Sequence, residues 1–254
     1  MAKTAAGSFP RLMPDASELG LDVYHLGYHS AESYGATPYL INDKESGINI
    51  LIDTPRYNSK LITTIKERFG GVDYIYLTHV DDIAEHVKFA DAFGAKRVIH
   101  ESEAHAELAM TSYSGAGIEE CEIKLEGQGP WEVFPGVSAK VYYQPGHTIG
   151  HTVLVYKDTV AFTGDHLAKV RQTGNLDAFT AYCKFSLEEQ ANSLDILNEE
   201  VGRTVKLVLP GHGRAYRTDF LYDDLHEAVQ RMRADLDEAR VPYILQNLCG
   251  GRFR

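Results

Sequence analysis

The chain alternates short apolar runs with segments whose apolar residues recur at helical spacing. Short apolar or β-branched runs predict strands. In the first half of the chain these runs lie at residues 21–26, 37–42, 48–52, 72–78 and 96–100. Helical spacing of apolar residues predicts helices at residues 59–69, 82–93 and 102–110. We therefore expect a group of strands followed by alternating helices and strands.

The second half repeats this outline. Strands are predicted at residues 120–125, 131–134, 137–144, 152–156, 159–163 and 205–209. Ser186 and Glu189 form a capping box that predicts a helix to about Glu199, and an apolar stripe predicts a long helix from about Asp219 to Arg240. Two β-rich halves that each carry helices predict an α/β fold with two packed sheets and helices outside, with a single mixed sheet as the alternative.

Composition is that of an ordinary globular protein. The chain has 254 residues, of which 44% are hydrophobic and 24% charged. We expect one domain over residues 1–254, with residues 1–20 as a flexible N-terminal extension. The start has no apolar core typical of a secretory signal, and no run approaches the roughly 18 apolar residues of a membrane span. These features predict a protein of the cytoplasm or of an organelle stroma or matrix, neither secreted nor bound to a membrane.

Charge and histidine content narrow the expected chemistry. The formal charge is −11, which disfavours a nucleic-acid partner and leaves a small molecule as the expected one. The sequence does not predict an oligomeric state. The chain has 11 histidines, the residue that most often binds metals and transfers protons near neutral pH.

Several of these histidines follow apolar strands directly. Four predicted strands end in a turn that carries His or Asp, and these residues are His79, His147, Asp165 and His212. A strand holds the backbone rigid, and a neighbouring glycine permits a tight turn, so these side chains can project into one cleft. This repeated arrangement predicts a metal site at the edge of a sheet.

At these positions the chain resembles the metallo-β-lactamase superfamily, in particular its glyoxalase II-like hydrolases. The resemblance rests on five motifs in the family's order, LIDTP at Asp53, LTHVDDIAEH at His79 to His86, QPGHTIGH at His147, FTGDH at Asp165 and LPGHG at His212. It implies a four-layer αβ/βα sandwich of two mixed β-sheets flanked by helices. It also implies one or two divalent metal ions, with zinc as the first expectation and iron or manganese as alternatives.

The first metal motif departs from the family pattern T-H-x-H-x-D-H. Thr78 and His79 match, but Asp81 occupies the place of the second histidine. Ile83 and Ala84 stand where Asp and His are expected, and neither side chain can bind a metal. A carboxylate is a harder ligand than imidazole, so this change shifts the metal preference towards iron or manganese.

Two alignments repair the motif. In one, two inserted residues move the Asp-His pair to Glu85 and His86. In the other, Asp82 and His86 lie four residues apart on a helix and supply ligands from one face. Both alignments retain His86, whereas the choice between Asp81 and Asp82 stays open and Glu85 is the weakest candidate.

The resemblance assigns roles to the remaining candidates. The predicted metal ligands are His79, Asp81, Asp82, His86, His147, Asp165 and His212. Asp165 is expected to bridge the metals and Asp82 to orient the nucleophile, so these two are the predicted catalytic residues. Residues expected to orient the ligands by hydrogen bonds are Asp53, His151 and His166. Lys169, Arg171 and Tyr182 follow the Asp165 motif and are candidates for binding the substrate.

The predicted activity is metal-dependent hydrolysis of a small ester or thioester by a metal-activated hydroxide. One alternative is a mononuclear iron oxidoreductase of the persulfide-dioxygenase type, because the altered first motif favours loss of the second metal. The other is a metal-poor, non-catalytic member of the fold. The altered motif favours this alternative too, while the intact later motifs oppose it.

Overall fold

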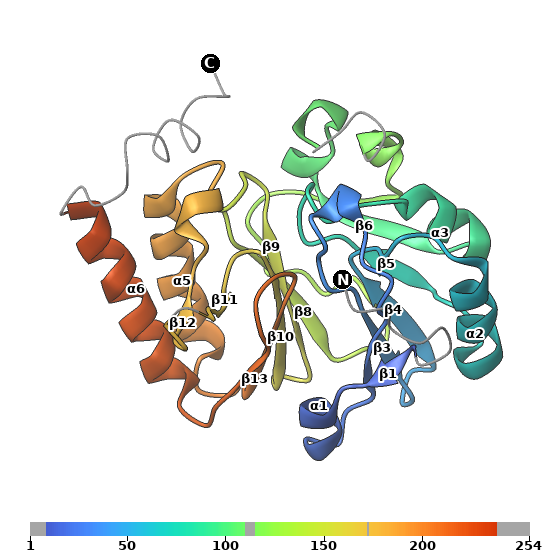
Figure 1. Ribbon diagram of the computed structural model, residues 1–254, viewed down its shortest axis with the longest axis horizontal. Coiled ribbons are helices and arrows are strands. Elements are labelled where there is room, and N and C mark those ends of the chain that lie inside the picture. Colours follow the sequence, from blue (N-terminus) through green and yellow to red (C-terminus); the bar gives the residue numbers. More distant parts are fainter. Residues whose placement is uncertain (1–8, 110–114, 172, 238–254) are drawn as a thin grey trace. The chain divides into compact units, whose positions relative to one another are not determined.

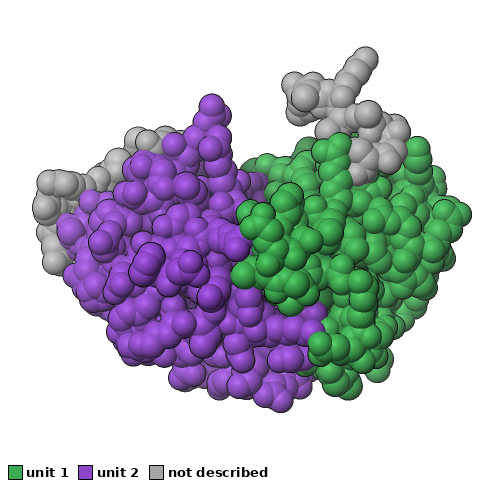
Figure 2. Space-filling view, turned by 90° about the horizontal axis from the view of Figure 1, so that it is seen from below, with its two compact units in different colours: residues 1–99, 104–124, 134–137 green, residues 100–103, 125–133, 138–254 purple. Residues whose placement is uncertain are grey.

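The computed structural model describes residues 9–109, 115–171 and 173–237 of the chain (Figure 1). The chain divides into two units, coloured green and purple in Figure 2. Unit 1 comprises residues 1–99, 104–124 and 134–137, and unit 2 comprises residues 100–103, 125–133 and 138–254. One domain over residues 1–254 stays a prediction.

Unit 1 is built on a seven-stranded mixed sheet whose strands lie in chain order. The strands are β1 (Arg11–Leu12), β2 (Val23–His25), β3 (Tyr39–Asp43), β4 (Ile48–Ile52), β5 (Tyr74–Tyr76), β6 (Lys96–His100) and β7 (Ile123–Leu125). Strands β1 to β4 pair antiparallel, whereas β4, β5 and β6 pair parallel. Parallel neighbours require crossovers, and these contain α2 (Ser59–Phe69) and α3 (His86–Phe93).

The core of unit 1 lies between its sheet and these helices. Leu61 and Ile65 of α2 pack in one buried cluster with Leu51 of β4 and Ile75 of β5. Full burial of each such side chain contributes about 1.5–3 kcal/mol. The predicted helix range is confirmed, although Asn58 rather than Ser59 is its N-cap, with Oδ1 3.0 Å from the amide nitrogen of Lys60.

The start of the chain corrects a prediction. Residues 11–18, which we expected to belong to a flexible extension, form β1 and the short helix α1 (Pro14–Glu18). β1 pairs with β2, and Ala16 is fully buried. Backbone pairing and a buried contact therefore order this segment despite its lack of a periodic apolar pattern. Residues 1–8 lie outside the described residues.

The predicted helix over residues 82–93 begins later than expected. Residues 80–85 form a turn, and α3 starts only at His86. Glu85 has φ 56°, a left-handed conformation that cannot belong to a right-handed helix. Asp82 and His86 therefore do not share a helix face, which removes the geometric basis of the second alignment.

Unit 2 is built on a five-stranded mixed sheet in the order β14-β13-β10-β9-β8. Its strands are β8 (Ala139–Tyr143), β9 (Thr152–Tyr156), β10 (Val160–Gly164), β13 (Leu207–Pro210) and β14 (Tyr216–Arg217). Only β10 and β13 pair parallel among them. A separate two-stranded hairpin joins β11 (Ala168–Lys169) to β12 (Leu176–Asp177).

Two helices cover the sheet of unit 2. They are α5 (Leu187–Val201) and α6 (Leu221–Asp237), and they lie side by side (Figure 1). Leu194 and Val229 of these helices share a buried cluster with Val153 and Val208 of the sheet. The predicted cap is confirmed, because Ser186 Oγ accepts a hydrogen bond from the amide of Glu189 at 3.2 Å.

The other helical segments that lie wholly within the described residues are single 3₁₀ turns. They are η1 (Ala31–Ser33), η2 (Glu101–Glu103), η3 (Ala106–Leu108), η4 (Ile118–Glu120) and η5 (Thr180–Tyr182). η2 and η3 replace most of the helix predicted over residues 102–110. No helix in the described part of the chain is long and apolar enough to cross a bilayer. Two mixed sheets flanked by helices confirm the predicted α/β class.

Candidate metal centre

In unit 1 the candidate ligands lie on the loop that joins β5 to α3. His79, Asp81 and Asp82 are each 3% exposed or less. His79 Nε2 lies 3.8 Å from Asp81 Oδ2, so the imidazole and the carboxylate present their ligand atoms side by side. Burial of these polar groups is costly unless they are paired or bind a metal. The loop thus holds several potential ligands in a largely dry environment.

A hydrogen-bonded relay orients His79. Asp53 follows β4 and accepts hydrogen bonds from the amide of Thr78 at 2.8 Å and from its hydroxyl at 3.0 Å. Thr78 Oγ1 also lies 2.9 Å from Nδ1 of His79. The hydroxyl of Thr78 has one proton, and it donates this proton in the hydrogen bond to Asp53. Nδ1 of His79 must therefore donate to the threonine oxygen. This arrangement places the lone pair of His79 on Nε2, the atom that faces Asp81.

His86 has a different environment from His79. Its Nδ1 lies 3.4 Å from Nη1 of Arg97, and a guanidinium can only donate, so Nδ1 must accept. The proton of the neutral ring then sits on Nε2, which leaves no lone pair there for a metal. Burial first, and then the charge of Arg97, lower the pKa of His86 to about 4.

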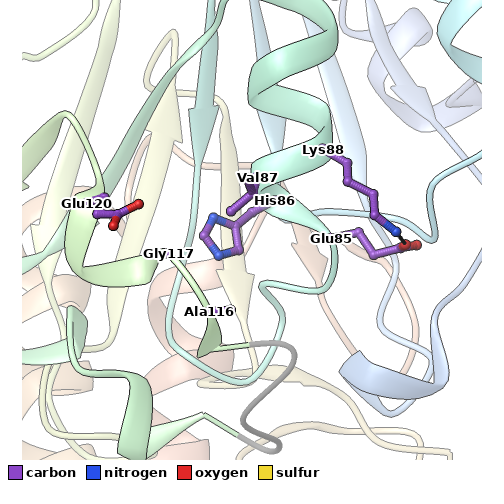
Figure 3. Close-up of a pocket in the computed structure, with 7 residues that line it drawn as sticks. All are labelled: Glu85, His86, Val87, Lys88, Ala116, Gly117 and Glu120. Carbon is purple, nitrogen blue, oxygen red and sulfur yellow. Dashed lines mark hydrogen bonds and ion pairs between the residues drawn. The ribbon is translucent and has the colours of Figure 1, made fainter.

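The surroundings of His86 also oppose a metal role. Its side chain lines a pocket of unit 1 of about 330 Å³, with Glu85 and Lys88 paired at one side and Gly117 at the other (Figure 3). Among the described residues, His86 belongs to no group of three potential ligands with atoms within 4.8 Å of one another. Its role as a ligand stays a prediction, and the fixed positive charge of Arg97 argues against it.

In unit 2 three candidate ligands come from three separate turns. His147 lies between β8 and β9, Asp165 follows β10, and His212 follows β13. Gly164 and Pro210 are partners at the ends of parallel strands, after a register shift between Phe162 and Gly164, and the amide of Gly211 donates to Gly164 oxygen at 2.8 Å. Since parallel strands end at the same edge of a sheet, the strand register itself brings Asp165 next to His212.

The distances from Asp165 to each of the two histidines fit pairs of metal ligands. Asp165 Oδ2 lies 3.8 Å from Nε2 of His147 and 3.6 Å from Nε2 of His212. Ligands that share a metal at bond lengths of about 2.0–2.2 Å lie roughly 3–4 Å apart. Imidazole nitrogen and carboxylate oxygen are also the donor types that zinc, iron and manganese accept. Asp165 therefore lies within ligand-sharing distance of His147 and, separately, of His212.

His151 and His166 lie next to His147 in unit 2. The ring of His151 meets that of His147 edge-on at 6.0 Å and stacks on that of His166 at 4.9 Å. His166 Nε2 lies 3.0 Å from Ser193 Oγ, which in turn lies 2.8 Å from Pro145 oxygen. Burial, and then His147, lower the pKa of His166 to about 3, so the ring is neutral. Both histidines occupy places from which they can support His147.

The predicted substrate residues have different environments. Lys169 Nζ lies 5.3 Å from the ring centre of Tyr216 and is engaged in a cation–π contact. Arg171 is exposed, and Tyr182 is 72% exposed. Their role in substrate binding stays a prediction.

Sequence reasoning did not predict the side chains that contact the candidate histidines. Thr78, Ser193 and Arg97 each form hydrogen bonds with a candidate histidine. Thr78 could have been found, because it directly precedes His79 within the motif. Ser193 lies 27 residues from its partner His166, and nothing in the apolar pattern predicts their contact.

Comparison with known proteins shows the fold. No family model and no curated protein matches the chain. Solved structures do match, among them the DIM-1 metallo-β-lactamase, with 16% identity, TM-score 0.61, and coverage of 82% of this chain and 93% of that one. A metallo-β-lactamase from Pontibacter korlensis has 21% identity, TM-score 0.56, and coverage of 82% and 94%. An archaeal metallo-β-lactamase superfamily protein from Sulfolobus tokodaii has 17% identity, TM-score 0.56, and coverage of 84% and 92%.

Proposed function

We propose that this chain, which has the metallo-β-lactamase fold, is a metal-dependent hydrolase acting on a small ester or thioester. The observation that carries the proposal is the position of Asp165 in unit 2, with one carboxylate oxygen within 3.8 Å of two imidazole nitrogens. His147 and Asp165 are buried, while the side chain of His212 is 26% exposed. A solvent-accessible ligand beside buried ones is consistent with a site that a substrate can enter.

The proposal draws ligands from both halves of the chain, as the motif order implies. His79, Asp81 and Asp82 come from the first half, and His147, Asp165 and His212 from the second. A divalent ion bound by such ligands lowers the pKa of water towards neutrality and so supplies a nucleophile for carbonyl attack. We propose one or two ions, with zinc as the first expectation and iron or manganese as alternatives.

The protein's own residues would prepare this chemistry in three ways. The relay through Asp53 and Thr78 presents Nε2 of His79 as a lone-pair donor. Asp165 lies within 3.8 Å of both His147 and His212. The paired ends of β10 and β13 set its position. Asp82, which is fully buried, is the proposed group that accepts a hydrogen bond from the nucleophilic water and orients it.

The proposal is tested by metal analysis of the full-length protein together with hydrolysis assays on a panel of small esters and thioesters. His147→Ala and Asp165→Ala are expected to lower kcat/KM by at least about 100-fold, since each removes a metal ligand. His226→Ala is the matched control, because His226 is an exposed histidine on α6. Full activity in both ligand variants would overturn the proposal.

A second candidate function follows from the altered first motif. Asp81 in place of histidine and the pairing of His86 with Arg97 both reduce the imidazole ligands available for a second ion. A single iron ion would suit an oxidoreductase of the persulfide-dioxygenase type. Iron near one per chain, with oxygen consumption on addition of glutathione persulfide and no hydrolysis, would favour this function over hydrolysis.

A further inference from the structure

The loop at residues 145–151, which carries His147 and His151, is anchored within unit 2 from several sides. Neutral side chains donate hydrogen bonds to its carbonyl oxygens, namely Tyr143 to Ile149 at 2.8 Å, Ser193 to Pro145 at 2.8 Å and Cys183 to Gly146 at 3.2 Å. These contacts hold the carbonyl groups of the loop. They do not account for its amide groups.

Glu103 binds the loop through an amide. Its Oε1 accepts a hydrogen bond of 2.6 Å from the backbone nitrogen of Gly150, and its side chain is fully buried. A fully buried carboxyl group needs hydrogen-bond partners, and the Gly150 amide is one of them. Gly150 directly precedes His151 and lies three residues after His147, so this bond acts on the segment between the two histidines.

The approach of Glu103 explains why position 150 is glycine. A Cβ atom at Gly150 would lie 2.7 Å from Cγ of Glu103 and 3.0 Å from Nδ1 of His100. Both distances are shorter than ordinary carbon contacts, so any side chain there would displace the carboxylate or the imidazole. The second glycine of the PGHTIGH motif therefore leaves the space that the side chain of Glu103 occupies.

The residues around Glu103 keep it in place. Glu103 ends η2, the turn that directly follows β6. His100 lies at the end of β6, with Nε2 3.0 Å from Gly127 oxygen and its ring stacked on Tyr143 at 4.6 Å. Both ring nitrogens and the ring face of His100 have contacts, which hold the imidazole in one orientation beside Gly150 and Glu103.

Burial of a carboxylate costs several kcal/mol and needs compensation by strong hydrogen bonds or a nearby cation. Gly150 supplies such a hydrogen bond. An isosteric apolar residue would fill the same space without this cost, but it could not hold an amide. The short bond from Gly150 therefore ties the position of this amide to the side chain of Glu103.

We propose that Glu103 is a positioning residue for the metal centre, which fixes Gly150 and thereby the orientation of His147 and His151. The proposal rests on the proposed function in one respect, since it requires that His147 binds a metal ion. Glu103 acts through the loop and does not itself touch metal or substrate.

The test compares Glu103→Ala, Glu103→Asp and Glu103→Gln in the full-length protein with the control Glu101→Ala, which removes an exposed carboxylate from the same turn. The readouts are Zn²⁺ affinity by competition with a chromophoric chelator, the visible spectrum of the Co²⁺ form, and the thermal midpoint of the metal-free protein. Glu103→Ala is expected to weaken Zn²⁺ binding by about 10- to 100-fold and to shift the Co²⁺ spectrum. Glu103→Gln keeps an acceptor oxygen in place, so it should recover affinity to within about threefold of wild type.

Glu103→Asp keeps the charge but withdraws the carboxylate by one methylene group, and it serves if Glu103→Ala does not fold. It is expected to weaken Zn²⁺ binding about 10-fold. Unchanged affinity and an unchanged Co²⁺ spectrum in the folded variants, with only a lowered thermal midpoint, would reduce Glu103 to a structural residue and overturn the proposal. A wild-type protein that binds none of Zn²⁺, Fe²⁺, Mn²⁺ and Co²⁺ would overturn the proposed function as well, so the two failures are distinguishable.

Discussion

The two units hold their candidate ligands by different physical means. In unit 2, Asp165 and His212 follow the ends of two paired parallel strands, so backbone register sets their distance. In unit 1, His79 follows one strand, and the hydrogen bonds of Thr78 with Asp53 and with Nδ1 of His79 set its orientation. Register is maintained by many backbone hydrogen bonds, whereas a relay of two side chains can be broken by one substitution. The set in unit 2 is therefore expected to be less sensitive to a single substitution than the set in unit 1.

The largest expected difference in kcat/KM is between substitutions of the carboxylates in the two sets, Asp165 in unit 2 and Asp81 in unit 1. Asp165 lies within 3.8 Å of two imidazoles, while Asp81 lies 3.8 Å from one. Asp165→Asn should therefore lower kcat/KM on the order of 1000-fold, and Asp81→Asn by about 10- to 100-fold. Both substitutions preserve side-chain shape, and steady-state hydrolysis measures both. Equal losses would contradict the ranking of the two units.

The next comparison sets two histidines of unit 1 against each other. His79 presents a lone pair on Nε2, whereas His86 accepts from Arg97 and carries its proton on Nε2. His79→Ala is expected to weaken metal binding by more than about 10-fold, and His86→Ala to leave affinity within about twofold of wild type.

Metal affinity is measured for both variants by chelator competition, with the thermal midpoint as a check of folding. If His86→Ala releases as much metal as His79→Ala, the ligand set predicted from the motif is right and the argument from Arg97 fails.

The smallest expected effects on metal affinity come from removing the hydroxyl groups that form hydrogen bonds with histidines in each unit. Thr78→Val removes the hydroxyl between Asp53 and His79 at nearly constant shape, and we expect metal affinity to fall about 10-fold. Ser193→Ala in unit 2 removes the partner of His166 and the donor to Pro145 oxygen, neither of which is a candidate ligand, so a loss of about threefold is expected. Isothermal titration with Zn²⁺ compares the two. A larger loss in Ser193→Ala would show that unit 2 depends on side-chain support as much as unit 1 does.

Much of the fold could be predicted from the chain, because local patterns dominate where strands and helices are regular. The strands at residues 48–52, 96–100 and 152–156 have the predicted bounds, and Ser186 caps α5 as expected. The prediction was wrong at residues 82–85, where the sequence is compatible with a helix but Glu85 adopts a left-handed conformation. The carboxylate of Glu85 binds the amide of Tyr57, a residue 28 positions away, and no local pattern can register such a contact.

The candidate site divides in the same way. The sequence by itself determined which residues could bind a metal and where each follows a strand, because ligand chemistry and strand pattern are both local properties. Only the tertiary structure decided that His86 faces Arg97, that Thr78 directs the lone pair of His79, and that Glu103 anchors Gly150. Each of these depends on the distance or direction between side chains in space, and for His86 and Gly150 the partners lie 11 and 47 positions away. Such contacts exist only once the sheets and turns have assembled.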